Sequence, residues 1–316
     1  MLPTLYTSAL SILSIATEGS FLDKSVYTEW MRKRYIVFCL FIILFLPVVI
    51  FFSIERQKTL DTTSKLSPTI TDATPAPFKF TTYTAPTINP KQVYKIAMIG
   101  DSMTVALGPH GGGASEYMNS LYKKKETDPQ RIVIDNYASS SSILAVDKQL
   151  SEKTTVNEYT FGPLLSEDYD LIIVESYAYN PLSQFGIEDG IKKQNESLDK
   201  LMTTILTARP HAAIVFVATI APNLENYAKA TQINRSQAER KKQAEERVAY
   251  LKNHIDYAIK HNIPVVNIYE KSLTIAGDGN ISYIDPTDDI HPSAEGVIFI
   301  GKELGNFIHE KQILPQ

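Results

Sequence analysis

The stretch Lys95-Ile96-Ala97-Met98-Ile99-Gly100-Asp101-Ser102-Met103-Thr104 decides the fold. Its apolar residues, bounded by polar ones and closed by Gly-Asp-Ser, are typical of a buried strand that ends at a sharp turn. In open α/β sheets, ligands bind at the carboxyl ends of the strands, so Ser102 follows the strand at a position suited to chemistry. An ordinary β-turn, or a helix capped by Asp101 or Ser102, fits the same residues. A catalytic serine therefore needs partners elsewhere in the chain.

The composition excludes several classes of protein. The 316 residues are 44% hydrophobic and carry a formal net charge of −4, which is typical of a globular protein. Lys and Arg are interspersed with Asp and Glu, so no basic stripe predicts a nucleic-acid partner. Gly100 does not begin either glycine pattern of a phosphate-binding loop. The single cysteine, Cys39, excludes an intrachain disulfide and a thiolate metal cluster.

The N-terminal part of the sequence predicts a membrane anchor. Residues 35–54 carry no charge, and as a helix they would be about 30 Å long, enough to cross the hydrocarbon core of a bilayer. A buried core helix and a cleaved signal peptide are the alternatives. The basic residues Arg32, Lys33 and Arg34 favour a cytoplasmic segment over residues 1–34. Met31, directly before them, raises the hypothesis that translation starts there.

Residues 55–91 are predicted to be a linker. They are rich in Thr, Ser and Pro, and they show no helical or strand periodicity. Phe78, Phe80 and Tyr83 within them are expected to pack on the flank of the domain that follows. The chain is thus predicted to be a single-pass protein of the cell membrane whose extracytoplasmic domain spans residues 92–316.

From residue 92 onward, strand-like and helix-like segments alternate, which predicts a parallel sheet covered by helices on both faces. Five strands are expected: Lys95–Ile99, Arg131–Asn136, Leu171–Glu175, Ala213–Ala218 and Pro264–Ile268. The clearest helices are expected at Gln237–Lys260 and at about Ser293–His309. The first of these has an apolar face at helical spacing, formed by Val248, Leu251, Ile255 and Ile259. Its charged residues between Arg240 and Glu246 are predicted to form a solvated face.

A second stretch, about 190 residues after Ser102, supplies candidate partners. A serine hydroxyl becomes a nucleophile when a histidine accepts its proton and a carboxylate orients that histidine. Asp288 and His291 are three residues apart in a turn before the last predicted helix, and this spacing allows the carboxylate to reach the ring. Taken singly, a histidine in such a loop is more often a surface residue, and Asp-Asp beside it is more often part of a turn.

Acyl transfer also requires hydrogen-bond donors aimed at the oxygen that becomes negative in the transition state. Asn180 is a candidate, because it follows the third predicted strand and should lie at the same sheet edge as Ser102. An ordinary Asn-Pro turn is the alternative. The other candidate donors are the backbone amides of Ser102 and of one residue in the loop 136–142.

These residues resemble the blocks of the SGNH, or GDSL-type, serine hydrolase family over about residues 93–310. Ile99-Gly100-Asp101-Ser102 is similar to the first block with the nucleophile, and Tyr179-Asn180-Pro181 resembles the third block with its oxyanion asparagine. Asp288-x-x-His291-Pro292-Ser293 is similar to the fifth block with the acid and the base. The resemblance implies a flavodoxin-like three-layer α/β/α fold, no metal or other cofactor, and hydrolysis or transfer of an ester-linked acyl group.

Two blocks depart from the family pattern. The second block usually carries a glycine whose backbone N–H completes the oxyanion hole, and here Ser141, or alternatively Ser140, stands at that place. A serine keeps the amide but loses the conformational freedom of glycine and crowds the pocket. In the third block, the usual Gly-x-Asn-Asp is replaced by Ala178-Tyr179-Asn180-Pro181, which keeps only the asparagine.

The predicted function is that of a membrane-anchored, extracytoplasmic serine esterase. Ser102 would attack an ester carbonyl, His291 would transfer the proton, and Asp288 would orient His291. Asn180 and the amides of Ser102 and Ser141 would stabilise the oxyanion. The predicted location favours O-acetyl esters of cell-envelope or exported carbohydrate as substrates. The alternatives are an O-acyltransferase with the same triad, a thioesterase or lysophospholipase, and a non-catalytic carbohydrate-binding module.

Overall fold

The structure is a computed structural model that describes residues 79–123, 129, 131–231 and 233–316. The predicted cytoplasmic segment 1–34, the predicted anchor 35–54 and residues 55–78 of the predicted linker lie outside these residues. Within the described ranges, no helix combines the length and the apolar character needed to cross a bilayer.

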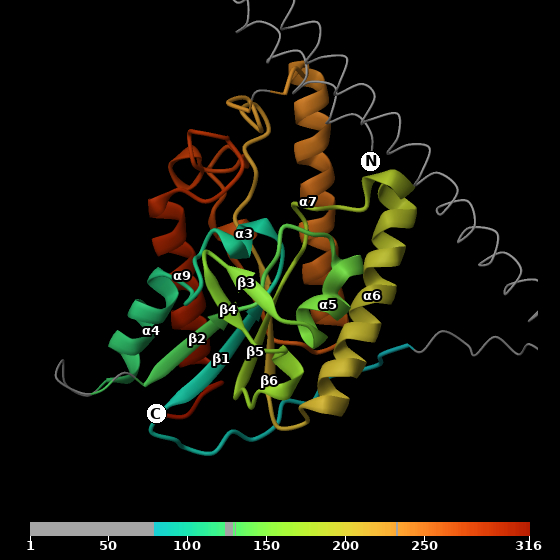
Figure 1. The fold of residues 1–316 in the computed structure, drawn as a ribbon. Helices are drawn as coiled ribbons and strands as arrows, with labels where there is room; N and C mark the ends of the chain where they lie inside the picture. Colours follow the sequence, from blue (N-terminus) through green and yellow to red (C-terminus); the bar gives the residue numbers. More distant parts are fainter. Residues whose placement is uncertain (1–78, 124–128, 130, 232) are drawn as a thin grey trace, which may run out of the picture. The chain divides into compact units, whose positions relative to one another are not determined.

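A five-stranded parallel sheet forms the centre of this domain (Figure 1). In the order in which they lie in the sheet, its strands are β2 (Ile132–Asn136), β1 (Tyr94–Ile99), β5 (Leu171–Glu175), β6 (Ala213–Ala218) and β7 (Val265–Asn267). Every residue of β5 and β6 is buried, as expected of strands that are covered on both faces. The predicted flavodoxin-like sheet is confirmed, and each strand end agrees with its predicted position to within one residue.

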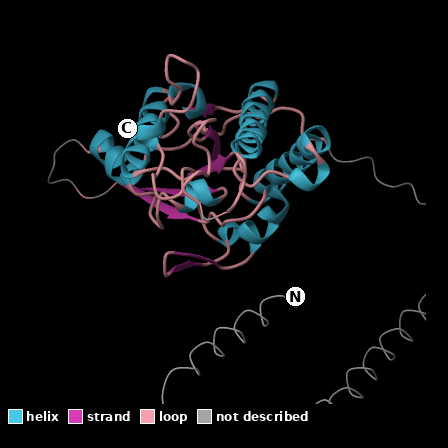
Figure 2. Ribbon diagram, turned by 90° about the horizontal axis from the view of Figure 1, so that it is seen from above, coloured by secondary structure: helices cyan, strands magenta, loops and turns pink. Residues whose placement is uncertain are grey.

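Helices cover both faces of the sheet and complete three layers (Figures 1 and 2). Helices α4 (Gly113–Tyr122) and α9 (Ala294–Glu310) pack against each other on one face. Their backbones approach so closely that a Cβ on Gly301 would lie 2.6 Å from the backbone nitrogen of Ala114. The other face is covered by α5 (Val146–Ser151), α6 (Ile187–Ala208) and α7 (Gln237–Lys260).

The remaining elements are short. Helix α3 (Ser102–Val105) follows β1, and helix α8 (Ile268–Lys271) follows β7. The structure also contains an antiparallel hairpin that the sequence did not predict, formed by β3 (Thr154–Val156) and β4 (Tyr159–Phe161). Its strands have only three residues each, too few for an alternating pattern to stand out. Asn157 and Glu158 in its turn both have positive φ, as the tight turns of β-hairpins require.

Helix α7 has the predicted bounds, and its predicted apolar face packs on the core except at Ile259. Leu251 and Ile255 are buried as expected, whereas Ile259 is 67% exposed. The buried face also includes His254 and Tyr257, whose rings stack on Phe216 of β6 at centroid distances of 4.5 Å and 6.1 Å. The prediction was wrong for Ile259 because it counted only aliphatic residues, while the packing against β6 is largely aromatic.

The folded domain begins before residue 92, so the predicted linker 55–91 is wrong at its C-terminal end. Phe80 and Tyr83 are buried, with exposed fractions of 7% and 1%. The Tyr83 N–H donates to the carbonyl of His261 at 2.8 Å, and its hydroxyl accepts the N–H of Ile214 at the start of β6. The expected packing of Phe80 and Tyr83 on the domain therefore occurs, and it places them in the core, whereas Phe78 lies outside the described residues.

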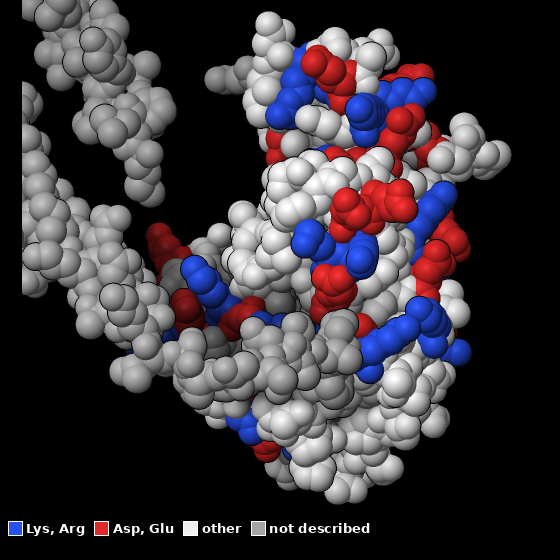
Figure 3. Space-filling model, turned by 90° about the vertical axis from the view of Figure 1, so that its right-hand side faces the viewer, with Lys and Arg blue, Asp and Glu red and all other residues white. Residues whose placement is uncertain are grey.

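Charges of both signs are mixed on the face formed by the outer sides of α6 and α7 (Figure 3). The first turns of α6 illustrate the pattern, because Glu188 and Asp189 each precede a lysine by four positions, Lys192 and Lys193. Where the described residues are visible on this face, blue and red side chains lie close together, which matches the interspersed charges of the sequence.

We expect His254 to make the domain less stable in acid. The ring is fully buried, and this burial lowers its pKa from 6.5 to about 3, against a smaller opposing effect of the Val174 backbone. Below pH 6.5 the unfolded chain binds a proton that the folded chain does not, so the free energy of unfolding falls by roughly 1.4 kcal/mol per pH unit until about pH 3.

Urea unfolding at pH 7 and pH 5 tests this prediction. Between these two values, the natural protein should lose about 2 kcal/mol more of its unfolding free energy than the His254→Leu variant. His211→Leu, at an exposed histidine, is the matched control and should behave like the natural protein. The same pH dependence in the natural protein and in His254→Leu would contradict the prediction.

Candidate active site

The turn after β1 places Ser102 at the carboxyl edge of the sheet, where it begins α3. Asp101 caps this helix, and its carboxylate accepts the N–H of Met103 at 2.9 Å. Gly100 is required before it, because a Cβ there would lie 2.6 Å from the Cβ of Glu175. The Ser102 hydroxyl is partly exposed and makes no hydrogen bond with any other group in the described part of the chain.

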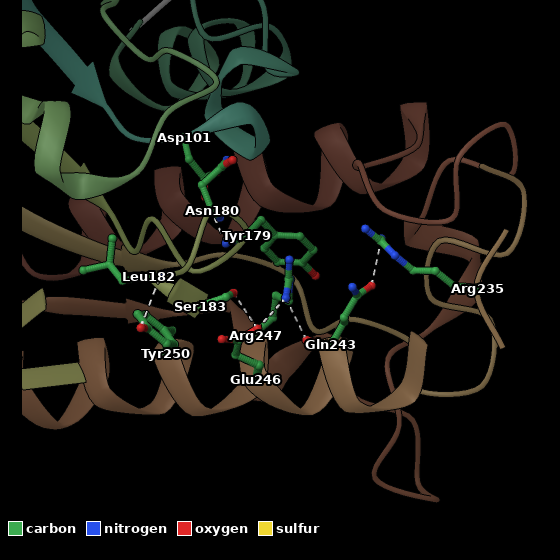
Figure 4. Close-up of polar contacts among 10 residues, drawn as sticks. All are labelled: Asp101, Tyr179, Asn180, Leu182, Ser183, Arg235, Gln243, Glu246, Arg247 and Tyr250. Carbon is green, nitrogen blue, oxygen red and sulfur yellow. Dashed lines mark hydrogen bonds and ion pairs between the residues drawn. The ribbon is translucent and has the colours of Figure 1, made fainter. Parts of the chain in front are cut away.

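The carboxylate of Asp101 also joins this turn to the loop after β5. It accepts the backbone N–H groups of Tyr179 at 2.9 Å and of Asn180 at 3.1 Å. Asn180 therefore lies beside Asp101 (Figure 4), at the same edge as Ser102. Strands β1 and β5 are neighbours in the sheet, and the strand order reverses between them. Such a switch point is where doubly wound sheets bind their ligands.

A second buried carboxylate, Glu175 at the end of β5, supports the same turn. It accepts the N–H groups of Asp101 at 3.2 Å and Tyr177 at 3.1 Å, and the hydroxyl of Ser176. Burial, and then the charge of Asp101, raise the pKa of Glu175 well above its ordinary range. The pair therefore favours one negative charge over two, with the charge on Asp101, whose carboxylate accepts three backbone N–H groups.

Asp288 and His291 are in direct contact. The carboxylate accepts a hydrogen bond from Nδ1 of His291 at 2.6 Å, and it also accepts the backbone N–H groups of Ile290 and His291 at 2.8 Å and 3.0 Å. Burial raises the pKa of Asp288, but these hydrogen bonds outweigh it, so the pKa lies below its ordinary value. An ionised carboxylate can only accept, so Nδ1 carries the proton and Nε2 is left as the basic nitrogen.

The loop that carries His291 lies at the same end of the sheet as α3 (Figure 1). No hydrogen bond joins Ser102 to His291, and Nε2 of His291 has no hydrogen-bond partner among the described residues. The structure thus brings Asp288 to His291 and Asp101 to Asn180, and it leaves the serine hydroxyl and the basic nitrogen unpaired. Bonds of this kind often form fully only when substrate is bound.

The predicted backbone donors of the oxyanion hole differ in their availability. The Ser102 N–H has no partner in the described part of the chain, as expected at the first position of a helix. The Ser141 N–H, in contrast, donates to the carbonyl of Ser139 at 2.6 Å, because residues 139–141 form a three-residue turn. The alternative amide, that of Ser140, makes no such bond and is in an exposed residue.

Sequence reasoning missed Gln149, which joins the turn before Ser102 to the loop that carries Ser139. Its amide nitrogen donates to the carbonyl of Gly100 at 2.9 Å and to the hydroxyl of Ser139 at 2.7 Å. Its amide oxygen accepts the hydroxyl of Tyr177 at 2.5 Å. Gln149 carries no signal in the sequence, because its partners come from three separate loops. Glu175 carries one, since it is a charged residue at the end of an otherwise apolar strand.

Comparison with known proteins identifies the family. Residues 96–304 match the model of the GDSL-like lipase/acylhydrolase family. The chain belongs to this family. It is accordingly an ester-hydrolysing enzyme, and the resemblance noted in the sequence is confirmed. No curated protein sequence matches the chain.

Several solved structures are similar to this GDSL-like hydrolase. A lipase/acylhydrolase from Enterococcus faecalis is 14% identical, with a TM-score of 0.47 over 69% of this chain and 97% of the other. The acetyl xylan esterase AlAXEase is 12% identical, with a TM-score of 0.46 over 66% and 97% of the two chains. A GDSL-like lipase from Bacteroides thetaiotaomicron is 13% identical, with a TM-score of 0.43 over 69% and 88%.

Among the residues that the structure describes, no group of three or more His, Cys, Asp or Glu side chains could hold a metal ion. That the hydrolase works without metal or other cofactor stays a prediction.

We expect Asp101→Asn to destabilise the hydrolase. An amide cannot accept all three backbone N–H groups that the buried carboxylate now accepts. Each unsatisfied buried donor costs about 1–3 kcal/mol, so urea unfolding should show a loss of about 2 kcal/mol or more.

Asp135→Asn is the matched control, because that half-buried carboxylate accepts a single hydroxyl, from Tyr169 at 2.8 Å. Its loss should stay below about 1 kcal/mol. Equal losses in the two variants would contradict the role assigned to Asp101.

Proposed function

We propose that this GDSL-like hydrolase is a serine esterase in which Ser102 is the nucleophile, His291 the general base and Asp288 the residue that orients His291. The observation that carries the proposal is the 2.6 Å hydrogen bond between Asp288 and Nδ1 of His291. It leaves Nε2 as the proton acceptor, on a loop at the same sheet edge as Ser102. A carboxylate with this contact also stabilises the imidazolium that forms during the reaction.

The proposed reaction has two halves. The Ser102 oxygen attacks the ester carbonyl while Nε2 of His291 takes the hydroxyl proton, and that proton then passes to the departing alcohol. Water attacks the resulting acyl-enzyme in the same way, with its proton passing through His291 to Ser102 as the acid leaves. The products are one alcohol and one carboxylic acid for each water consumed.

The oxyanion formed in each half needs fixed donors. We assign two of them to the side chain of Asn180 and the N–H of Ser102. The carboxylate of Asp101 fixes the backbone beside both donors, because it accepts the N–H groups of Met103 and Asn180. The third is assigned to the Ser140 N–H, because the Ser141 N–H bonds to Ser139. Loss of one such donor typically lowers the rate by about 10²–10³.

The substrate class follows from the predicted location. The uncharged stretch 35–54 and the basic residues before it support a single-pass anchor with the hydrolase outside the cytoplasm. Esters available there include O-acetyl groups on cell-envelope or exported carbohydrate, which we propose as the natural substrates.

Replacement of the nucleophile tests the proposal. Ser102→Ala should lower the release of p-nitrophenol from p-nitrophenyl acetate by at least about 10³-fold, because the proposed acyl-enzyme forms on the Ser102 hydroxyl. Ser120→Ala, at an exposed serine of α4, is the matched control and should retain full activity.

A fluorophosphonate probe provides an independent readout. It should label the natural protein and the Ser120→Ala control, and leave Ser102→Ala unlabelled. Hydrolysis or labelling that persists in Ser102→Ala at the level of the control would contradict the proposed nucleophile.

A further inference from the structure

Helix α7 holds the loop that carries Asn180 at two points (Figure 4). The N–H of Leu182 donates to the hydroxyl of Tyr250 at 3.1 Å, and the hydroxyl of Ser183 donates to Oε2 of Glu246 at 2.9 Å. Both contacts lie within three residues after Asn180. Asp101 fixes the backbone of Asn180 itself, so the loop is held both at Asn180 and just beyond it.

The residue after Asn180 explains why a side chain supplies the first of these contacts. Pro181 has no N–H, so Leu182 carries the first backbone donor that can anchor the loop after Asn180. The hydroxyl of Tyr250 accepts this buried donor, which would otherwise lack a partner. In this chain, Tyr250 thus supports the loop where the family pattern around the asparagine has changed.

The Tyr250 hydroxyl occupies the space that a side chain at position 190 of α6 would need. Gly190 lies within α6, and a Cβ at that position would be 2.0 Å from the Tyr250 hydroxyl oxygen. Glycine is unfavourable inside a helix by roughly 0.5–1 kcal/mol relative to alanine. Here it lets a buried tyrosine reach between α6 and the loop that carries Asn180.

The second contact depends on a buried ion pair rather than on a solvated face. Glu246 bonds to Arg247 at 2.9 Å, and the side chains of the two residues are only 12% and 14% exposed. The prediction that the charges up to Glu246 are solvated is therefore wrong for Glu246. Arg247 also donates to the carbonyl of Gln243 at 3.1 Å, and its guanidinium lies 5.5 Å from the ring centroid of Tyr227. These contacts compensate and fix the carboxylate that receives Ser183.

The same side of α7 connects to the loop with the proposed base. The N–H of Ala228, next to Tyr227, donates to the carbonyl of Asp289 at 3.1 Å, two residues before His291. The N–H of Ala230 donates to the Asp289 carboxylate at 2.8 Å. Helix α7 therefore contacts the Asn180 loop directly, and it is connected to the His291 loop through the segment that carries Tyr227.

We propose that Tyr250 and Glu246 are positioning residues of the oxyanion hole. They hold Leu182 and Ser183, and thereby set the place of the Asn180 side chain relative to Ser102. This inference rests on the proposed function, in which Asn180 donates to the oxyanion. Neither residue needs to touch the substrate.

Removal of the two hydroxyl contacts tests the inference. Tyr250→Phe should lower kcat about tenfold with KM within about twofold, because a displaced donor to the oxyanion weakens the transition state rather than substrate binding. Ser183→Ala, which removes the bond to Glu246 without disturbing the ion pair, should lower kcat about threefold. Tyr257→Phe is the matched control, because its hydroxyl donates to Asp199 on α6 at 2.7 Å, and kcat should stay within about twofold.

A double-mutant cycle shows whether the effect passes through Asn180. In an Asn180→Ala background, Tyr250→Phe should change kcat by less than about twofold, because the donor that Tyr250 positions is already absent. A full effect in that background, or a Tyr250→Phe variant as active as Tyr257→Phe, would overturn the inference. If thermal unfolding shows that Tyr250→Phe does not fold, Ser183→Ala takes its place in the same cycle, with Ser197→Ala, a half-buried serine of α6, as control.

The same set of variants separates this inference from the proposed function. Natural activity in both Ser102→Ala and Asn180→Ala would refute the proposed function, and the inference with it. Activity lost in these two variants but natural in both Tyr250→Phe and Ser183→Ala would refute the positioning role alone.

Discussion

The buried carboxylate of Asp101 is the interaction on which the proposed active site depends. It accepts backbone N–H groups from two segments that lie about 80 residues apart in the sequence, one in the nucleophile turn and one in the loop with Asn180. A single side chain thus fixes the spacing between Ser102 and Asn180. Strands β1 and β5 are adjacent at the switch point of the sheet. The hydrogen bonds of Asp101 therefore connect the two loops at the edge where such folds bind their ligands.

Buried carboxylates around this edge are stabilised in two different ways. Glu175 lies against Asp101, where burial and the neighbouring charge raise its pKa, and Glu246 lies against Arg247 on α7. Each of these groups accepts or donates several hydrogen bonds, which is the condition for keeping ionisable groups in a low-dielectric interior. The loops of the site are thus fixed by buried polar contacts, while Ser102 itself remains partly exposed.

Features that depend on neighbours in the sequence could be predicted, and features that depend on distant partners could not. The strand before Ser102 and the spacing of Asp288 and His291 are local, so sequence patterns indicated both. Glu246 lies in a run of charges that is typical of a solvated helix face, and only the loop after β5 makes it a buried anchor. The amide of Ser141 was expected to be available, and the turn that it closes with Ser139 is a matter of backbone geometry that residue types do not specify.

The most direct test of the central claim is a crystal structure of the protein after reaction with a phosphonate ester that mimics the tetrahedral intermediate. We predict phosphorus bonded to Oγ of Ser102, the phosphonyl oxygen within hydrogen-bond distance of the Asn180 side chain and the Ser102 N–H, and Nε2 of His291 near the leaving-group position. Phosphorus on another residue, or a phosphonyl oxygen pointing away from Asn180, would contradict the account.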